Sequence, residues 1–391
     1  MIEALFFLSL AALGYTYAGY PAVVWMWARV WPKPVARAAH EPAVAIVVVA
    51  YNEASRLGDK LESCLAQDYA GRLRVVVASD GSNDGMNELV ESYRHRGVTL
   101  LPFAQRRGKA ACLNDAVAVC DEDVIVFTDA RQRLNREAVR CLVENLADPK
   151  VGAVSGELVF VADDMTPFAE GVDAYWKYEK FIRQQESQAY SVVGVTGALY
   201  ALRRTSFRPI PPQTILDDVA IPMNVAMQRL RVVFDKRAHA YDRPSHAPQQ
   251  ERMRKVRTLA GNFQLVAMTP QLLLPWRNPI VLQFVSHKLM RLLAPVAMGA
   301  LLLSNLALLG KGGFYRGFFA LQLAGYALPL LGAVSQRAAR WKPVKIASAF
   351  LLLNWCVVLG AREFLSNKNA HLWRSKPTAS GVAATDAHPP R

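Results

Sequence analysis

Residues 124–131 read V-I-V-F-T-D-A-R, and this stretch decides the fold. Its first five residues are apolar or β-branched, which predicts a buried strand that runs almost directly into Asp129. Open α/β sheets bind their ligands at the carboxyl ends of the strands, so Asp129 is the first candidate for a binding residue. A helix cap or a turn is the other interpretation of a single Asp at this place.

Two earlier segments repeat the pattern and favour the binding interpretation. Residues 44–50 read V-A-I-V-V-V-A, and residues 73–78 read L-R-V-V-V-A. Such runs are typical of strands that are covered on both faces, and parallel strands end at the same edge of a sheet. The polar residues that follow the two runs are Tyr51, Asn52, Glu53, Ser79 and Asp80. We therefore expect polar side chains from three strands to meet at one sheet edge.

The segments between and after these strands predict an alternating α/β order. Residues 57–67 and 86–96 have helical spacing, and a further strand over 98–101 completes a β-α-β-α-β unit. The elements predicted downstream are a helix over 137–147, a strand pair over 151–161, an amphipathic helix over 167–190, a glycine-punctuated strand and turn over 192–202, a helix that opens at 216–218 and a strand over 231–235. This layout is that of a nucleotide-binding sheet.

Four uncharged runs predict membrane helices on both sides of this α/β region. Residues 4–28 carry no charge and, as a helix, exceed the ~30 Å hydrocarbon core of a bilayer. Glu3 before the run and the bulky Trp27 and Trp31 at its end argue against a cleaved signal peptide and favour a retained anchor. Three more runs cover residues 292–310, 317–336 and 346–361. The last run is short, which is compatible with a full span, a re-entrant turn or a place at the membrane interface.

The formal net charge of +14 does not indicate nucleic-acid binding, because no zinc-finger spacing, helix-turn-helix signal or aromatic-basic platform accompanies it. Basic residues instead flank the apolar runs, as Lys33 and Arg37 do after the first run and Lys288 and Arg291 do before the second. The positive-inside rule then places residues 37–283 in the cytoplasm. The five Cys lack paired metal-ligand spacing, which agrees with a reducing compartment.

The order of short motifs along the chain carries a family resemblance. The motifs are A-Y-N-E, D-G-S-N-D, R-G-K-A, T-D-A-R, T-G-A-L-Y-A-L-R-R and L-D-D, followed by a basic helix and apolar runs. Together they resemble the membrane-bound branch of the family 2 glycosyltransferases, which includes the cellulose, hyaluronan and poly-N-acetylglucosamine synthases. The resemblance covers residues 44–261 and implies an α/β fold of the GT-A (Rossmann-like) type. This nucleotide-sugar-binding domain is expected between an N-terminal transmembrane helix and a C-terminal transmembrane helical region.

The expected domain order follows from the motifs and the apolar runs. It comprises an N-terminal anchor over residues 1–31, a cytoplasmic GT-A domain over 42–245, basic interfacial helices over 246–290, about three transmembrane helices over 291–362 and a tail over 363–391.

By position in these motifs, the resemblance implies the residues of the donor site. Tyr51, Glu53 and Asp80 match residues that hold the nucleotide base and the ribose. Lys109 matches a residue near the diphosphate, and Asp129 matches the first acid of the D-x-D motif, a ligand for Mg²⁺ or Mn²⁺.

The resemblance also implies the acceptor side of the site. Asp218 matches the last acid of the T-E-D motif, which takes the proton from the acceptor hydroxyl, and Asp217 precedes it. Arg257 is retained from the Q-x-x-R-W motif and is counted with these catalytic residues. Thr196 and Gly197 are expected to bind the acceptor, because Gly in a strand often marks a close approach of the backbone to a ligand.

Two departures from the family pattern concern the metal and the acceptor. Arg131 replaces the second acid of D-x-D, and Thr258 replaces the Trp of Q-x-x-R-W. Two hypotheses follow for the donor diphosphate. Either Asp129 holds a divalent ion that the diphosphate mainly bridges, or Arg131 supplies part of that positive charge through bidentate hydrogen bonds. We favour the first, because a carboxylate so close to phosphates is repulsive without a cation between them.

The expected function is inverting transfer of a sugar from a nucleotide-diphosphate sugar, of the UDP-linked type, in exopolysaccharide or cell-envelope glycan synthesis. The acceptor is a polysaccharide or a polyprenyl-linked glycan, and both alternatives remain open at this stage. Expected partners are membrane lipid and polysaccharide-export proteins, at a bacterial inner membrane. The alternative class is a sugar-nucleotide sensor or scaffold whose catalytic site has decayed at Arg131.

Overall fold

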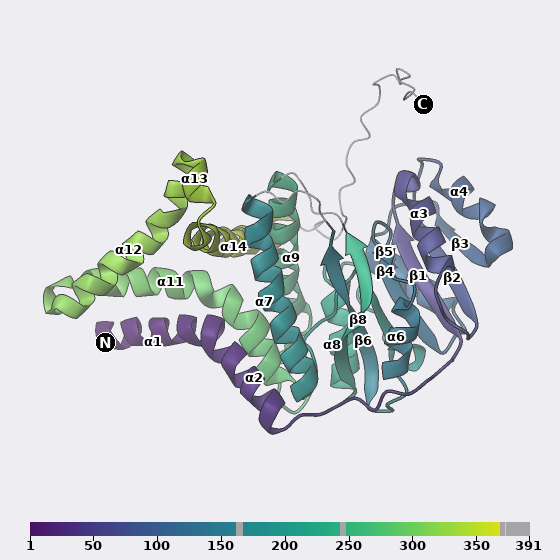
Figure 1. Ribbon diagram of the computed structural model, residues 1–391, viewed down its shortest axis with the longest axis horizontal. Coiled ribbons are helices and arrows are strands. Elements are labelled where there is room, and N and C mark those ends of the chain that lie inside the picture. The colour runs from purple at the N-terminus through teal and green to yellow at the C-terminus, as the bar shows by residue number, and fades with distance from the viewer. Residues whose placement is uncertain (162–166, 243–247, 368–371, 373–391) are drawn as a thin grey trace, which may run out of the picture.

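The structure is a computed structural model that describes residues 1–161, 167–242, 248–367 and 372. Figure 1 shows an α/β domain on one side and long helices on the other, with the N-terminus at the far end of the helical part. The strands are β1 Val44–Ala50, β2 Leu73–Asp80, β3 Val98–Phe103, β4 Val124–Asp129, β5 Arg133–Leu134, β6 Val151–Phe160, β7 Tyr200–Arg203 and β8 Arg231–Asp242.

The strands form one mixed sheet of eight in the order β3-β2-β1-β4-β7-β6-β8-β5. The first four in this order are parallel, β7 is antiparallel to both of its neighbours, and β6 and β8 are parallel. The predicted β-α-β-α-β unit is therefore the parallel half of the sheet. The sequence did not predict the mixed half, where segments far apart in the chain become neighbours.

Helices cover both faces of the parallel half, which explains its unbroken apolar runs. One buried cluster joins Val47 of β1 to α5 (Lys109–Ala118) and α8 (Asp217–Met227). The other joins Val48 of β1 to α3 (Ala54–Leu65), α4 (Met86–Ser92) and α6 (Ala138–Asn145). Every residue of β1 is buried, as expected for a strand whose two faces both lie in a core.

Two predicted strands differ from the structure. The predicted pair over 151–161 is wrong, because β6 is one strand that pairs with β7 on one side and β8 on the other. Gly152 and Gly156 do not form a turn but allow neighbouring segments to approach the strand closely. A Cβ on Gly152, for example, would lie 2.5 Å from Val225 Cγ1. The predicted strand over 192–202 is reduced to β7, because residues 192–199 run as a loop against α8. The backbone N–H of Val195, for example, donates to the carbonyl of Asp218.

Two helices connect the α/β domain to the apolar part. Helix α7 (Pro167–Ala189) and helix α9 (Pro248–Met268) stand side by side at the domain's edge, next to α2 (Tyr20–Val30) and α14 (Lys342–Ser366). The remaining helices are α1 Ile2–Gly14, α10 Val281–Phe284, α11 Met290–Ala307, α12 Gly313–Val334 and α13 Gln336–Ala339, with π-helical turns at 15–19 and 285–289.

Among the described residues, four helices are long and apolar enough to cross a membrane. They cover Ile2–Val30, Val281–Ala307, Gly313–Val334 and Lys342–Ser366, and each includes one of the four uncharged runs, in whole or for all but its last residues. The helix Val281–Ala307 begins before its uncharged run, so His287, Lys288 and Arg291 lie inside the helix.

Side-chain contacts show which ends of these helices lie close together. Phe6 near the start of α1 packs on Leu308 after α11 and on Phe318 of α12, so these ends lie together, away from the α/β domain. At the other end of α12, Gly332 lies against Val344 near the start of α14. Helix α14 ends with Phe364 stacked on Phe263 of α9. It is one continuous helix, so the re-entrant turn considered for the short apolar run is wrong.

Candidate active site

The carboxyl ends of β1, β2 and β4 meet at one edge of the sheet, as the sequence predicted. Val49 of β1 pairs with Asp129 of β4, and Ala50 pairs with Ser79 of β2, next to Asp80. Two further segments reach this edge: the start of α5 with Lys109 and the start of α8 with Asp217 and Asp218. The site is therefore built from residues spread over most of the α/β domain.

Lys109 connects the two acidic motifs. Its Nζ lies 2.9 Å from Asp129 Oδ1 and 3.0 Å from Asp217 Oδ2. Burial by itself lowers the pKa of Lys109, but Asp129 and Asp217 outweigh it and hold the pKa above its ordinary value. Lys109 is thus a permanent positive charge between D-A-R and L-D-D.

Asp80 anchors the R-G-K-A loop that carries Lys109. It is fully buried, and its carboxylate accepts hydrogen bonds from the backbone N–H groups of Arg107 and Gly108, at 2.6 and 3.0 Å. Gly108 has a φ of +90°, a backbone conformation that favours glycine. In this structure the Asp80 carboxylate positions the loop, and its predicted contact with the ribose remains a prediction.

Tyr51 and Glu53 lie at the end of β1 beside this loop. The guanidinium of Arg106 stacks over the Tyr51 ring, with its carbon 4.1 Å from the ring centre. Asn52, between Tyr51 and Glu53 in the sequence, has a φ of +54°, and its Oδ1 accepts a hydrogen bond from the backbone N–H of Asn83. Burial raises the pKa of Glu53. The end of β1, the turn after β2 and the loop that carries Arg106 thus contact one another and form one wall of the site, which includes the Tyr51 ring.

Asp217 and Asp218 begin α8 on the opposite side of Lys109. Burial and the charge of Asp217 raise the pKa of Asp218 to about 6, although Lys109, Lys288 and Arg183 act in the opposite direction. Asp217 is 6% exposed and Asp218 is half-buried. A half-buried carboxylate with a raised pKa has the properties of a general base.

The predicted acceptor residues lie directly against this base. A Cβ on Gly197 would lie 3.6 Å from Asp218 Oδ2, at ordinary contact distance, so the glycine leaves this side of the carboxylate uncovered. Thr196 is buried, and its backbone N–H donates to Ser155 Oγ at 3.1 Å.

Arg257 of α9 faces the same acids. Burial lowers its pKa, and the charges of Asp217, Asp218 and Asp129 act in the opposite direction. The predicted catalytic residues therefore come together in the structure, with Lys109 in contact with Asp129 and Asp217 and with Arg257 under the influence of all three carboxylates.

Arg131 makes an interaction that the sequence did not predict. Its Nη2 lies 2.7 Å from Asp242 Oδ2 at the end of β8, and Gln132 donates to the same oxygen at 3.0 Å. Lys60, also missed, is buried behind the turn and donates to Thr128 Oγ1 and to the carbonyl of Gln132. Neither Asp242 nor Lys60 has a sequence signal, because each comes from a segment distant from the motif.

The donor set for a divalent ion is small. Within the described ranges no three His, Cys, Asp or Glu side chains are placed to hold a metal. Asp129 is the single carboxylate at the D-x-D position, and Asp242 is engaged by Arg131. One carboxylate fits a Mg²⁺-type ion only where substrate phosphates supply further oxygen ligands, which is the common arrangement for this ion.

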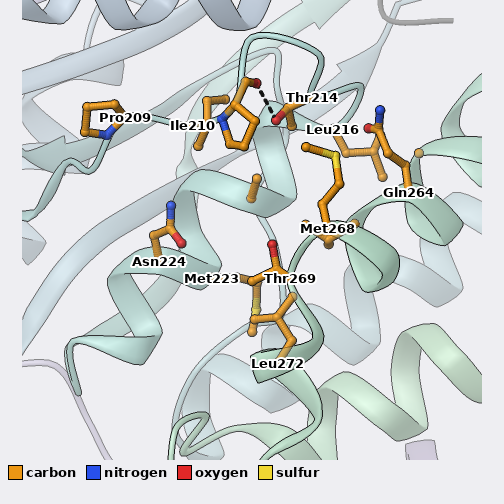
Figure 2. A pocket seen from close by; sticks show the side chains of 14 residues that line it. Pro209, Ile210, Thr214, Leu216, Met223, Asn224, Gln264, Met268, Thr269 and Leu272 are labelled. Atoms are coloured by element: carbon orange, nitrogen blue, oxygen red, sulfur yellow. Dashed lines mark hydrogen bonds between the residues drawn. The ribbon is translucent and has the colours of Figure 1, made fainter. Parts of the chain in front are cut away.

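A cavity of about 150 Å³ with apolar and polar lining lies beside the L-D-D segment (Figure 2). Leu216, Met223, Met268 and Leu272 line it from the loop before α8, from α8, from α9 and from the turn after α9. Thr214 closes its loop by donating from Oγ1 to the carbonyl of Pro211 at 2.7 Å. The cavity therefore lies between α9 and α8, the helix that begins with Asp217 and Asp218.

Comparisons with known proteins identify the family of this chain. The family model described as glycosyl transferase family 2 matches residues 45–210. An N-acetylglucosaminyltransferase of Azorhizobium caulinodans is 28% identical over 174 residues, 43% of this chain and 44% of the relative. One of Bradyrhizobium elkanii is 34% identical over 122 residues, 30% of this chain and 67% of the relative. The match thus spans less than half the length of the first of these relatives.

A solved structure is similar over nearly the whole chain. It is a mannosyltransferase of Pyrobaculum calidifontis in complex with GDP-Man and Mn²⁺, and it is 26% identical with a TM-score of 0.69. The similarity covers 94% of this chain and 100% of that one.

Fold and site together define the class of the protein: it is a glycosyltransferase with a GT-A fold that carries helices able to span a membrane. Within that class, the chain belongs to glycosyl transferase family 2. The resemblance, the fold and the enzyme class expected from the sequence are confirmed.

Proposed function

We propose that the protein is a membrane-bound inverting glycosyltransferase with Asp218 as its general base. It moves a sugar from a nucleotide-diphosphate sugar to a hydroxyl of a glycan or lipid-linked acceptor. The observation that carries the proposal is that Asp218, whose pKa is raised to about 6, lies beside Gly197 and within the influence of the cations Lys109 and Arg257. A base and a cationic leaving-group site on opposite sides are what an inverting displacement needs.

The reaction then proceeds as one displacement. The acceptor oxygen attacks the anomeric carbon of the donor sugar while its proton passes to Asp218. The bond from that carbon to the diphosphate oxygen breaks, and the nucleoside diphosphate leaves with the electron pair. Lys109 and Arg257 offset the negative charge that grows on the diphosphate. Asp217 keeps Lys109 in place and raises the basicity of Asp218.

Mg²⁺ or Mn²⁺ would bind at Asp129 together with the donor diphosphate. The solved mannosyltransferase contains Mn²⁺, which supports divalent metal use in this fold. When bound, such an ion would withdraw negative charge from the leaving diphosphate. The remaining steps use this chain's own groups: Lys109 pairs with Asp129, and Asp242 holds Arg131 beside the site.

The donor proposal follows the names of the relatives. Two are N-acetylglucosaminyltransferases, so a UDP-linked hexosamine is the first donor to test, and GDP-mannose from the similar structure is the second. Tyr51 and Glu53, at the wall formed with Arg106, would contact the nucleotide.

The catalytic domain would face the cytoplasm of a bacterial inner membrane, with the basic residues around Lys33 and Arg37 on the same side. Because Phe364 of α14 stacks on Phe263 of α9, the tail would begin on that side as well. Helix α14 would then lie at the interface, and three helices would cross the bilayer.

The testing experiment incubates the purified full-length chain with UDP-N-acetylglucosamine, UDP-glucose or GDP-mannose and measures release of the nucleoside diphosphate. A glycosyltransferase turns over at least one donor, slowly with water and faster with acceptor. A sensor or scaffold with a decayed site would bind donor without turnover, and that result would overturn the proposal. Export partners would be sought only after turnover is established.

A further inference from the structure

A buried ionic cluster connects α7 to the helix that begins at Val281, beside α2. His287 connects the two elements: its Nε2 lies 3.0 Å from Glu179 Oε2, and its Nδ1 lies 2.9 Å from Glu186 Oε1. Arg291 pairs with Glu179, and the Tyr20 hydroxyl donates to Glu186. The two carboxylates of α7 are therefore already engaged.

Two further cations of the same cluster interact with the charge of Glu179 without a direct contact to it. Arg183 lies on the face of α7 between Glu179 and Glu186, and Lys288 follows His287. Within the part of the chain that the structure describes, no carboxylate lies within 4 Å of Arg183 or Lys288, and neither makes a hydrogen bond. Both are half-buried. Partly buried cations that no carboxylate contacts directly cost free energy, so the site favours an anion.

This excess of positive charge borders the general base. Arg183 lines a small cleft together with Thr196, which precedes Gly197 at Asp218. The positive charges of Arg183 and Lys288 both act to lower the pKa of Asp218. Trp176 lines the same cleft, and its buried indole N–H has no hydrogen-bond partner among the described residues. An anion bound here would therefore belong to the acceptor, on the side of the base rather than of the donor diphosphate.

The position along the helices points to a lipid. Lys288 lies in the first turns of Val281–Ala307, a helix long and apolar enough to cross a membrane. Trp276, just before this helix, is 67% exposed, as is common for Trp at a membrane interface. Phosphate groups of membrane lipids lie at the same level. A phosphate ester at the membrane surface matches cations there in charge and in depth.

We propose that Arg183 and Lys288 form a phosphate-binding subsite, and that the acceptor is a sugar joined to a membrane lipid through a phosphate or diphosphate. The inference rests on the proposed function and deepens it. The lipid phosphate does not react. It is held by the two cations so that a hydroxyl of the attached sugar reaches Asp218, gives it the proton and attacks the donor. A base is needed for a sugar hydroxyl, which makes the sugar rather than the phosphate the nucleophile.

The test compares two acceptors that carry the same sugar, phytanyl diphosphate N-acetylglucosamine and a neutral alkyl N-acetylglucosaminide, with the full chain in lipid nanodiscs. The variants are Arg183→Gln and Lys288→Gln, with Lys342→Gln as control, an exposed cation at the start of α14. Each of the first two should raise KM for the diphosphate acceptor about tenfold, the effect of one charged hydrogen bond, and change KM for the neutral acceptor less than twofold. Arg183→Lys and Lys288→Arg should recover most of the loss.

Several outcomes would overturn the inference. Equal KM values of the wild-type protein for both acceptors would remove the phosphate subsite and leave the proposed function intact. Equal losses on both acceptors would assign Arg183 and Lys288 a structural role. Inorganic diphosphate that competes as strongly as the lipid would indicate a soluble anion. If no donor turns over, the proposed function fails, and titration of the diphosphate lipid against wild-type and variant nanodiscs still measures the subsite.

Discussion

Replacing Asp218 by Asn should lower activity and raise stability at the same time. Asn keeps the size of Asp but cannot take a proton, so transfer should fall by ~10² to 10⁴-fold while the donor still binds. The folded protein holds the pKa of Asp218 at about 6 instead of 3.8. Folding therefore favours the protonated form, and the stability of the wild-type protein falls as pH rises from about 4 to about 6.

The magnitude follows from that shift. About two pKa units correspond to roughly 3 kcal/mol of unfolding free energy at pH 7, as an upper limit because Asp218 is only half-buried. A neutral Asn does not carry this cost. In a domain of this size the gain in Tm is on the order of 10 °C at most, and it should vanish below about pH 4.

The assay pairs initial rates of nucleoside diphosphate release with thermal unfolding of the same samples across pH. Wild-type kcat/KM should fall about tenfold between pH 7 and pH 5, as Asp218 takes up a proton. Asp217→Asn is the matched control: it removes a charge that raises this pKa, so the acidic limb should move to lower pH. If Asp217→Asn abolishes transfer while Asp218→Asn keeps the wild-type pH profile, the base is assigned to the wrong residue.

Other groups of the site give further predictions. Lys109→Met removes the cation between two carboxylates and should lower kcat by ~10²-fold or more, whereas an unchanged kcat would show that a metal ion alone neutralises the diphosphate. Chelation with EDTA should abolish transfer and Mn²⁺ should restore it; full activity after chelation would reject the metal at Asp129. Asp242→Asn frees Arg131 from its ion pair, so residual activity in EDTA should increase if Arg131 can reach the diphosphate, and stay constant if it cannot. Reporter fusions at Lys33 and at Lys376, which lies in the tail outside the described residues, should both give cytoplasmic signals, and an external signal at Lys33 would overturn the topology.

The sequence by itself determined the parallel half of the sheet and the polar ends of its strands. Periodicity and apolar runs are local properties, and the burial of β1 on both faces follows from such a run. The order of motifs then determined the family and brought Asp129, Asp218 and Lys109 into one predicted site. It also located the uncharged runs that lie in long apolar helices.

Only the tertiary structure decided how these residues interact. Arg131, one of the two groups considered for the donor diphosphate, forms an ion pair with Asp242 of β8, which lies more than a hundred residues away in the chain. A strand pair was expected over residues 151–161, but these residues form the single strand β6, in which Gly152 leaves room for Val225 of α8. Arg183 and Lys288 form a candidate subsite only because α7 and the helix from Val281 pack together, which brings both cations close enough to influence Asp218. Pairings of this kind depend on which distant segments become neighbours, and local patterns carry no information about that choice.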